Sequence, residues 1–161
     1  IGSRFVESGP IVIIQDRDGR REELKVDRSK HNHPMYPLVV LVDKSSASAS
    51  EIVSGAIQDN NAGTLVGTDT FGKARVQTVS ALTDGSAVAV TTAKYLTSKG
   101  RDINKVGVKP DIYVASPEDP IEPGDLKEDK QLVKALEVLK EKMGISTEKP
   151  KLVKDSPDKK K

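Results

Sequence analysis

The chain has 161 residues and a formal net charge of +2, a size that fits a single domain. It contains no cysteine, which excludes disulfides, thiol catalysis and cysteine-based zinc sites. No apolar run approaches the roughly 20 residues that a membrane-spanning helix needs. No cluster of Lys and Arg on a predicted folded segment indicates nucleic-acid binding, so we expect no nucleic-acid partner.

The end of the chain differs in composition from the rest. Residues 149–161 contain six Lys, two Asp and two Pro, and Leu152 and Val153 are the apolar side chains among them. Such a segment buries too little apolar surface to offset its loss of conformational entropy on folding. We therefore expect a folded unit over residues 1–145 and a disordered basic tail over residues 146–161. Six Lys less two Asp give this end a charge of +4, so the remainder is near −2.

Strand signals dominate the first part of the chain. Residues 11–14 predict a buried strand, the turn 16–19 follows, and residues 24–26 predict the return strand of a hairpin. Residues 28–37 are polar with two prolines and predict a loop. The apolar run 38–42 predicts a strand at the centre of a sheet with both faces covered.

A helix is predicted over residues 45–60, followed by a short strand over residues 64–67. The helix prediction rests on four apolar residues that share one helical face, namely Ile52, Val53, Ala56 and Ile57.

The next segments predict a second hairpin. Two β-rich runs, 76–83 and 86–95, are joined by Asp84-Gly85, a dipeptide typical of tight hairpin turns. Residues 97–108 predict irregular structure and residues 110–114 a short edge strand.

A second helix is predicted from Asp125, with Glu128 completing a capping box and Gly144 ending the helix. We expect its core-facing stripe to consist of Leu132, Leu136, Leu139 and Met143. The whole order predicts an α/β fold with a mixed β-sheet and packed helices.

Ser48 lies where the predicted strand 38–42 passes into the first helix. A nucleophile at such a junction faces the unpaired N–H groups of the helix N-terminus, which can stabilise an oxyanion. The small residues Ala47 and Ala49 leave room for a substrate backbone. Ser48 and Glu51 also form an S-x-x-E capping box, whose ordinary role is structural.

A catalytic serine needs a base, and the chain offers few histidines. His31 and His33 lie in the polar loop, and we interpret them as surface residues and not as metal ligands. Lysine acts as a base only when it is neutral, which burial favours. Lys73 follows Phe71-Gly72 at a turn that enters the sheet, where its side chain can point inward.

Four segments in order resemble the C-terminal-processing (tail-specific) peptidases, family S41. They are Val42–Asn60 with its S-A-S-E unit, Gly63–Thr78 with F-G-K, Leu82–Thr97, and Gly100–Ile112. The final helix also fits the end of that family. The resemblance implies a ClpP/crotonase-like catalytic domain, of which residues 1–145 are the C-terminal part, and a location outside the cytoplasm (periplasm, cell envelope or lumen).

The resemblance also implies the roles of individual residues. Ser48 matches the nucleophile and Lys73 the general base, 25 positions later. Gln77 matches a glutamine that orients the base, and the backbone N–H of Ala49 matches an oxyanion donor. The implied reaction is cleavage of proteins near their C-termini through an acyl-enzyme intermediate, with no cofactor and no metal.

The chain departs from the family pattern in two respects. Ala74 stands where the family has glycine after F-G-K, so we expect this turn to use ordinary backbone dihedrals. The upstream PDZ domain and the D-x-R-x-N-P-G-G-like segment of the family are not among these residues, and we expect the chain to be part of a longer protein.

Three hypotheses follow from this pattern. The first is a serine endopeptidase acting on protein or peptide C-terminal tails, with a homodimer as a candidate assembly. The second is a catalytically inactive fragment, scaffold or protein-binding module on the same fold. The third is an esterase or acyltransferase.

Overall fold

The computed structural model describes residues 1–31, 36–116 and 126–145. Seven strands and two α-helices lie in these ranges, together with the short 3-10 helices η1 (Gly2–Arg4) and η2 (Arg28–Lys30). The expected tail, residues 146–161, lies outside the described residues. No helix among the described residues is both long enough and apolar enough to cross a membrane.

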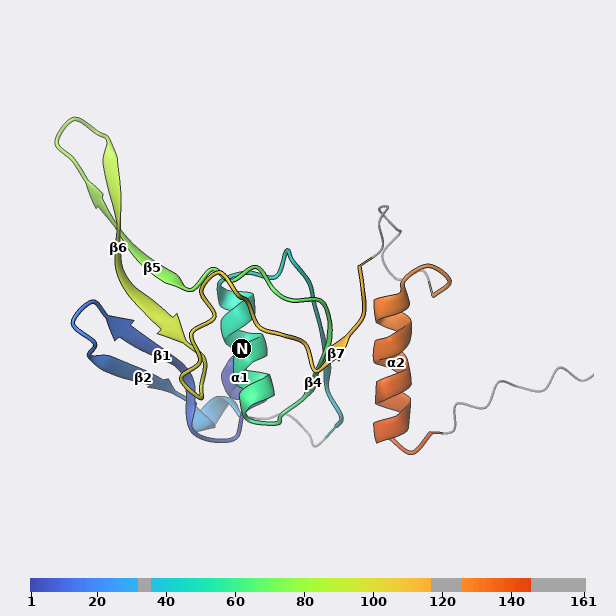
Figure 1. Ribbon diagram of the computed structural model, residues 1–161. Helices are drawn as coiled ribbons and strands as arrows, with labels where there is room; N and C mark the ends of the chain where they lie inside the picture. The colour runs from blue at the N-terminus through green and yellow to red at the C-terminus, as the bar shows by residue number, and fades with distance from the viewer. Residues whose placement is uncertain (32–35, 117–125, 146–161) are drawn as a thin grey trace, which may run out of the picture.

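The strands form two sheets (Figure 1). An antiparallel sheet has the order β2-β1-β6-β5, and its strands are β1 (Pro10–Asp16), β2 (Arg21–Lys25), β5 (Arg75–Ala81) and β6 (Ala87–Leu96). A parallel sheet has the order β3-β4-β7, and its strands are β3 (Val39–Val42), β4 (Thr64–Gly67) and β7 (Ile112–Tyr113). The predicted mixed α/β layout is confirmed, with the two strand directions segregated into separate sheets.

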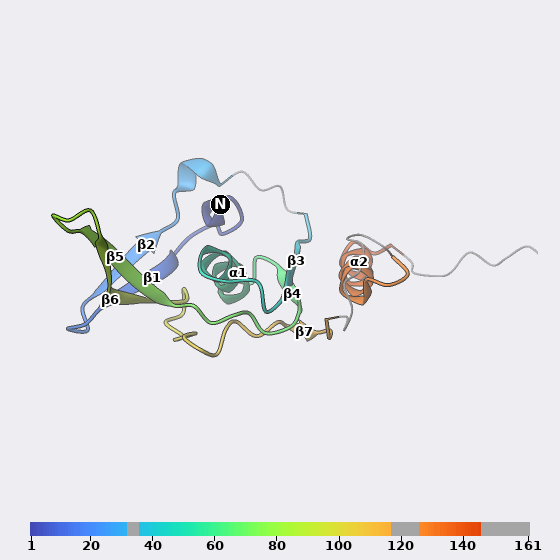
Figure 2. The same cartoon turned by 90° about the horizontal axis from the view of Figure 1, so that it is seen from above.

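Helix α1 (Ala49–Asp59) lies between the two sheets, and α2 (Lys130–Lys142) covers the opposite face of the parallel sheet (Figure 2). The β3-α1-β4 segment is therefore a parallel crossover unit, in which a helix connects two parallel neighbouring strands. The core between α1 and the sheets is built from eight buried residues: Val12, Val42, Ile57, Leu65, Ala74, Tyr95, Ile103 and Val108.

The predicted hairpins are both present. β1 and β2 pair around the turn at 16–19, and β5 and β6 pair antiparallel from Arg75↔Lys94 to Ala81↔Ala87. The far half of the β5–β6 hairpin projects beyond the sheet as an exposed arm (Figure 1). The irregular segment after β6 and the short edge strand β7 are confirmed as well.

The predicted central position of β3 is wrong. β3 is an edge strand of its sheet, and Leu41 is 43% exposed. The two covered faces are confirmed, because α1 and α2 lie on opposite sides of this sheet (Figure 2). The apolar run thus reports coverage of the faces and not the position of the strand within the sheet.

Two details of α2 also differ from prediction. The helix begins at Lys130 with Asp129 as its N-cap, whose side chain accepts a hydrogen bond from the Leu132 N–H, and Asp125 lies outside the described residues. Its most buried residues are Ala135 and Val138, while Met143 is 57% exposed. Leu132, Leu136 and Leu139 of the predicted stripe are half-buried, so the buried face of the helix centres on Ala135 and Val138 and not on the leucines.

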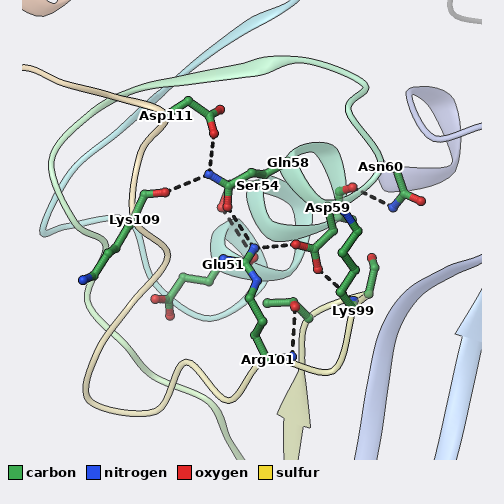
Figure 3. Close-up of polar contacts among 12 residues, drawn as sticks. Glu51, Ser54, Gln58, Asp59, Asn60, Lys99, Arg101, Lys109 and Asp111 are labelled. Atoms are coloured by element: carbon green, nitrogen blue, oxygen red, sulfur yellow. Dashed lines mark hydrogen bonds and ion pairs between the residues drawn. The ribbon is translucent and has the colours of Figure 1, made fainter.

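A polar network fastens the C-terminal half of α1 to the segment 97–111 (Figure 3). The Arg101 guanidinium donates to Asp59 at 2.5 Å and to the Gln58 side-chain oxygen at 2.8 Å. Gln58 in turn donates to Asp111 at 2.8 Å, and Asp111 accepts from the N–H of Leu65 in β4 at 2.7 Å. This network fixes an irregular segment that lies against the site described next.

Candidate active site

Ser48 is the N-cap of α1, and its backbone is strained. Its dihedrals are φ 56° and ψ −113°, in a region that non-glycine residues rarely occupy. Such a conformation costs on the order of 1–3 kcal/mol and persists only where the surrounding structure enforces it. Ser48 is exposed. A sharp, strained turn between a strand and a helix is a way of presenting a serine hydroxyl to a substrate.

The predicted helix over 45–60 therefore begins four residues late. Ser45 and Ser46 belong to a turn that the Asp43 carboxylate holds, accepting their N–H groups at 2.9 and 3.1 Å. The capping box of Ser48 and Glu51 is present, and the Glu51 carboxylate accepts from the Ser48 N–H at 2.9 Å. The structural role of this pair is thus real.

Glu51 does more than cap the helix. Its side chain is fully buried, and it reaches the turn before β5, about twenty residues further along the chain. Its Oε1 accepts from the Thr70 hydroxyl at 2.5 Å and from the Gly72 N–H at 2.7 Å, and its Oε2 accepts from the Lys73 N–H at 2.9 Å. One carboxylate therefore joins the serine turn to the lysine turn.

A single oxygen atom connects the serine turn to the lysine turn. Glu51 Oε2 accepts both the Ser48 N–H and the Lys73 N–H. A second link comes from the Phe71 N–H, which donates to the Ser46 carbonyl at 3.0 Å. The backbones of Ser48 and Lys73, separated by 25 positions, are thereby fixed relative to each other.

Gly72 makes the lysine turn possible. Its φ is +84°, and a Cβ at this position would lie 2.8 Å from the Val106 nitrogen. Ala74 is absent from the residues with positive φ, so the expected ordinary dihedrals at that position are confirmed. The left-handed conformation falls on the glycine before Lys73 and not on the residue after it.

Lys73 does not point inward as the sequence predicts. The residue is exposed, whereas Ala74 is fully buried in the core cluster. Side chains alternate between the two faces of an extended segment, and the small alanine takes the inward position. Among the hydrogen bonds of the described residues, none joins Ser48 Oγ to Lys73 Nζ. Catalytic contacts of this kind are often looser in the absence of substrate.

Gln77 lies on β5, four residues beyond Lys73, and is exposed. The register of β5 with β6 shifts between Val76 and Gln77. Such a shift interrupts the regular pairing of the two strands directly before Gln77. In the described part of the chain its side chain makes no hydrogen bond with Lys73.

The N–H of Ala49 is available to a ligand. It is the first helical N–H of α1, and within residues 36–116 it donates no hydrogen bond. The partial positive charge at a helix N-terminus is concentrated on such unpaired groups. This donor lies directly after Ser48, where it can face a carbonyl oxygen of a substrate that the Ser48 hydroxyl attacks.

Tyr95 on β6 closes the site from the core side. Its hydroxyl lies within reach of the Lys73 carbonyl and 3.3 Å from the Ser48 carbonyl. Burial raises its pKa to about 12, and the negative charge of Glu51 adds to this effect. Sequence reasoning missed Tyr95, and it recognised Glu51 only as a helix cap.

No metal site is apparent in the described ranges, where no three His, Asp or Glu side chains are grouped to hold an ion. His31 is half-buried, with Nδ1 enclosed and without a hydrogen-bond partner. His33 lies outside the described residues.

Residues 1–114 match the model of Peptidase family S41. Because this match covers well over half of the chain, the chain belongs to peptidase family S41.

The relatives most similar in sequence include proteins named C-terminal processing peptidases. The chain is 45% identical over 114 residues to the chloroplastic C-terminal processing peptidase of Tetradesmus obliquus, covering 71% of this chain and 24% of that protein. It is 54% identical over 102 residues to the chloroplastic carboxyl-terminal-processing peptidase 3 of Arabidopsis thaliana, covering 63% of this chain and 20% of that protein. The chain thus spans a quarter or less of the length of these relatives.

A solved structure agrees with this placement. The photosystem II D1 C-terminal processing protease superposes with a TM-score of 0.66 at 45% identity, over 71% of this chain and 29% of that one. The predicted fold class is therefore confirmed at the level of a known family member.

Proposed function

We propose that this chain is the C-terminal part of the catalytic domain of a serine endopeptidase, comprising residues 1–145, with Ser48 as nucleophile and Lys73 as general base. The observation that carries the proposal is the strained backbone of Ser48 at a helix N-terminus, tied through one oxygen of Glu51 to the backbone of Lys73. Membership of family S41 and the names of the relatives support it.

The reaction begins with proton transfer. Lys73 in its neutral form removes the proton from Ser48 Oγ, and the oxygen attacks the carbonyl carbon of the scissile peptide bond. The negative charge moves to the carbonyl oxygen, where the Ala49 N–H stabilises it. Protonated Lys73 then donates to the leaving amine, and an ester between Ser48 and the substrate remains.

Deacylation reverses these roles. Lys73 takes a proton from water, and the resulting hydroxide attacks the ester carbonyl. Protonated Lys73 then returns the proton to the departing Ser48 Oγ, which releases the carboxylic acid product and leaves the Ser48 hydroxyl and the neutral amine. Gln77 orients the Lys73 amine once substrate is bound. Because Lys73 is exposed here, we infer that the bound peptide itself excludes water from the amine.

We further propose that the substrates are proteins or peptides cut near their C-termini, that a PDZ domain precedes this segment, and that the enzyme acts outside the cytoplasm. The reaction as proposed needs no cofactor and no metal. The assembly we propose is a homodimer.

The test uses the complete protein that contains this chain. Ser48→Ala and Lys73→Ala are each expected to lower kcat for cleavage of a peptide by about a thousandfold or more, without unfolding the protein. Ser45→Ala and Lys44→Ala are matched controls, because both residues are exposed and neighbour the site without a proposed role. They should cleave at the wild-type rate.

Each alternative gives a different result. Undiminished peptide cleavage by Lys73→Ala ends the proposal. A wild-type protein that cleaves no peptide but hydrolyses small thioesters indicates an esterase or acyltransferase. A protein that does neither indicates a scaffold.

A further inference from the structure

The backbone of Tyr95 is fixed by its neighbours on both sides of β6. Its backbone N–H donates to the Ala74 carbonyl at 3.1 Å, and β6 pairs it with Ile14 of β1. The residue is 5% exposed. The position of the phenol is therefore set by the core and does not depend on the two turns that contact its hydroxyl.

The hydroxyl of Tyr95 contacts the same two residues as the carboxylate of Glu51, at their carbonyl groups. Glu51 Oε2 accepts the N–H groups of Ser48 and Lys73 at 2.9 Å each. The Tyr95 hydroxyl faces the carbonyl oxygens of those two residues, at 3.3 Å from that of Ser48 and in closer contact with that of Lys73. Each of the two residues is thus gripped at both its N–H and its carbonyl.

A phenol has one proton, so it serves two carbonyls only as a shared donor. The closer Lys73 carbonyl receives the main hydrogen bond, and the Ser48 carbonyl receives the weaker share. Burial raises the pKa of this hydroxyl, and the nearby charge of Glu51 raises it further. The donor therefore stays protonated throughout the neutral range.

We propose that Tyr95 is a positioning residue for the Ser48–Lys73 pair, whose hydroxyl fixes the separation of the two backbones through their carbonyl groups, as Glu51 does through their N–H groups. The inference rests on the proposed function of that pair. Tyr95 is buried and does not meet the substrate, so it acts by holding Ser48 and Lys73 in register. Misplacement of reacting groups by about 1 Å costs up to about a hundredfold in rate.

The test is Tyr95→Phe in the complete protein, which removes the hydroxyl and keeps the ring in the core. We expect kcat for peptide cleavage to fall by about tenfold to a hundredfold. KM is expected to stay within about twofold, because no substrate contact is lost.

Ser98→Ala is the matched control. Ser98 lies three residues beyond Tyr95 and away from the Ser48–Lys73 pair. Its hydroxyl also donates to a backbone carbonyl, that of Ile11 at 3.1 Å. Its loss removes the same kind of hydrogen bond, so a purely structural role for Tyr95 predicts equal effects of the two variants. Our proposal predicts a wild-type kcat for Ser98→Ala and a reduced kcat for Tyr95→Phe.

A second measurement covers the case in which Tyr95→Phe fails to fold. A ring-fluorinated tyrosine at position 95 keeps the hydroxyl but ionises at lower pH, so the donor is lost earlier as pH rises. We expect wild-type activity at neutral pH and an alkaline loss of activity displaced to lower pH than in the wild type. An unchanged alkaline profile overturns the proposal, as does a Tyr95→Phe kcat equal to that of Ser98→Ala.

These outcomes separate the two proposals. If Lys73→Ala retains full activity, the dyad itself is wrong. If Lys73→Ala is inactive and Tyr95→Phe is not impaired, the dyad stands and the positioning role of Tyr95 fails.

Discussion

Two carboxylates eight residues apart on α1 are both buried, and the fold accommodates them in different ways. Glu51 is fully buried and accepts from four neutral donors: the N–H groups of Ser48, Gly72 and Lys73 and the hydroxyl of Thr70. Asp59 has a side chain only 3% exposed and is paired with the Arg101 guanidinium, with the Lys99 N–H as a further donor at 2.8 Å.

The position on the helix accounts for the difference. Glu51 lies in the first turn, where the positive end of the helix dipole favours a negative charge. Asp59 is the last helical residue, where the dipole disfavours one, and a cation compensates. A buried carboxylate near a helix N-terminus can thus hold neutral backbone groups, which is what an active-site turn needs.

The two carboxylates also support the lysine turn by different routes. Glu51 bonds the turn directly. Asp59 anchors the segment 97–111, in which Lys105 donates its N–H to the Gly72 carbonyl at 2.8 Å. The direct route predicts the larger consequences when it is broken.

Glu51→Ala is expected to have the largest effect. It leaves several buried donors unsatisfied, so we expect a loss of about 3–5 kcal/mol in the free energy of unfolding and no measurable peptide cleavage. Urea unfolding and a peptide-cleavage assay measure both. Glu51→Gln, which retains one acceptor oxygen, should recover part of the stability. Cleavage at the wild-type rate by folded Glu51→Ala would show that the carboxylate does not position the dyad.

The charge of Glu51 is also expected to be visible at Tyr95. The pKa of Tyr95 rises from 10.0 to about 12, so the folded state keeps a proton that the unfolded state loses. The resulting contribution to the free energy of unfolding is about 2–3 kcal/mol. It is fully present below pH 10 and is lost as pH rises toward 12. In Glu51→Gln the pKa should fall part of the way back, since burial remains. Titration of tyrosinate absorbance, with Tyr95→Phe as the reference that identifies the Tyr95 signal, measures this pKa. An identical Tyr95 titration in the wild type and in Glu51→Gln would show that Glu51 has no influence on it.

Asp59→Ala is expected to cost less, about 2 kcal/mol. Arg101 is half-exposed and can return to water, so its charge is not stranded in the core. Activity should fall through the loosened 97–111 segment, and by less than in Glu51→Ala. Arg101→Ala is the matched variant. If the two single variants and the double variant are equally destabilised, the pair acts as one unit.

Salt is expected to have the smallest effect on stability, and that effect should differ between the two carboxylates. Raising the ionic strength screens the Asp59–Arg101 pair, in which the Arg101 side chain is half-exposed, and should reduce the cost of Asp59→Ala by about 0.5 kcal/mol. The cost of Glu51→Ala should not change, because its partners carry no charge. Equal salt dependence of the two variants, measured by urea unfolding, would remove the distinction.

Local patterns in the sequence predict the elements of this fold well. The Asp84-Gly85 turn and the alternating runs around it suffice for the β5–β6 hairpin, and the apolar face of α1 suffices for that helix. The edge position of β3 was not predictable, since it depends on which strands pair with it across the sheet.

The site divides in the same way. The resemblance selects Ser48 and Lys73 because both lie within short motifs. The second role of Glu51 depends on a turn that folds beside it from about twenty residues away. The role of Tyr95 depends on the pairing of β6, so no local pattern contains it. The outward direction of Lys73 follows from the burial of Ala74, which the pattern of apolar residues before β5 leaves ambiguous.

The most direct test of the account is covalent labelling of the complete protein with a fluorophosphonate probe, with the modified residue located by mass spectrometry. The account predicts a single adduct on the peptide that contains Ser48, formed by the wild type and lost in Lys73→Ala. Labelling of a different serine, or labelling of Ser48 at the same rate without Lys73, would contradict it.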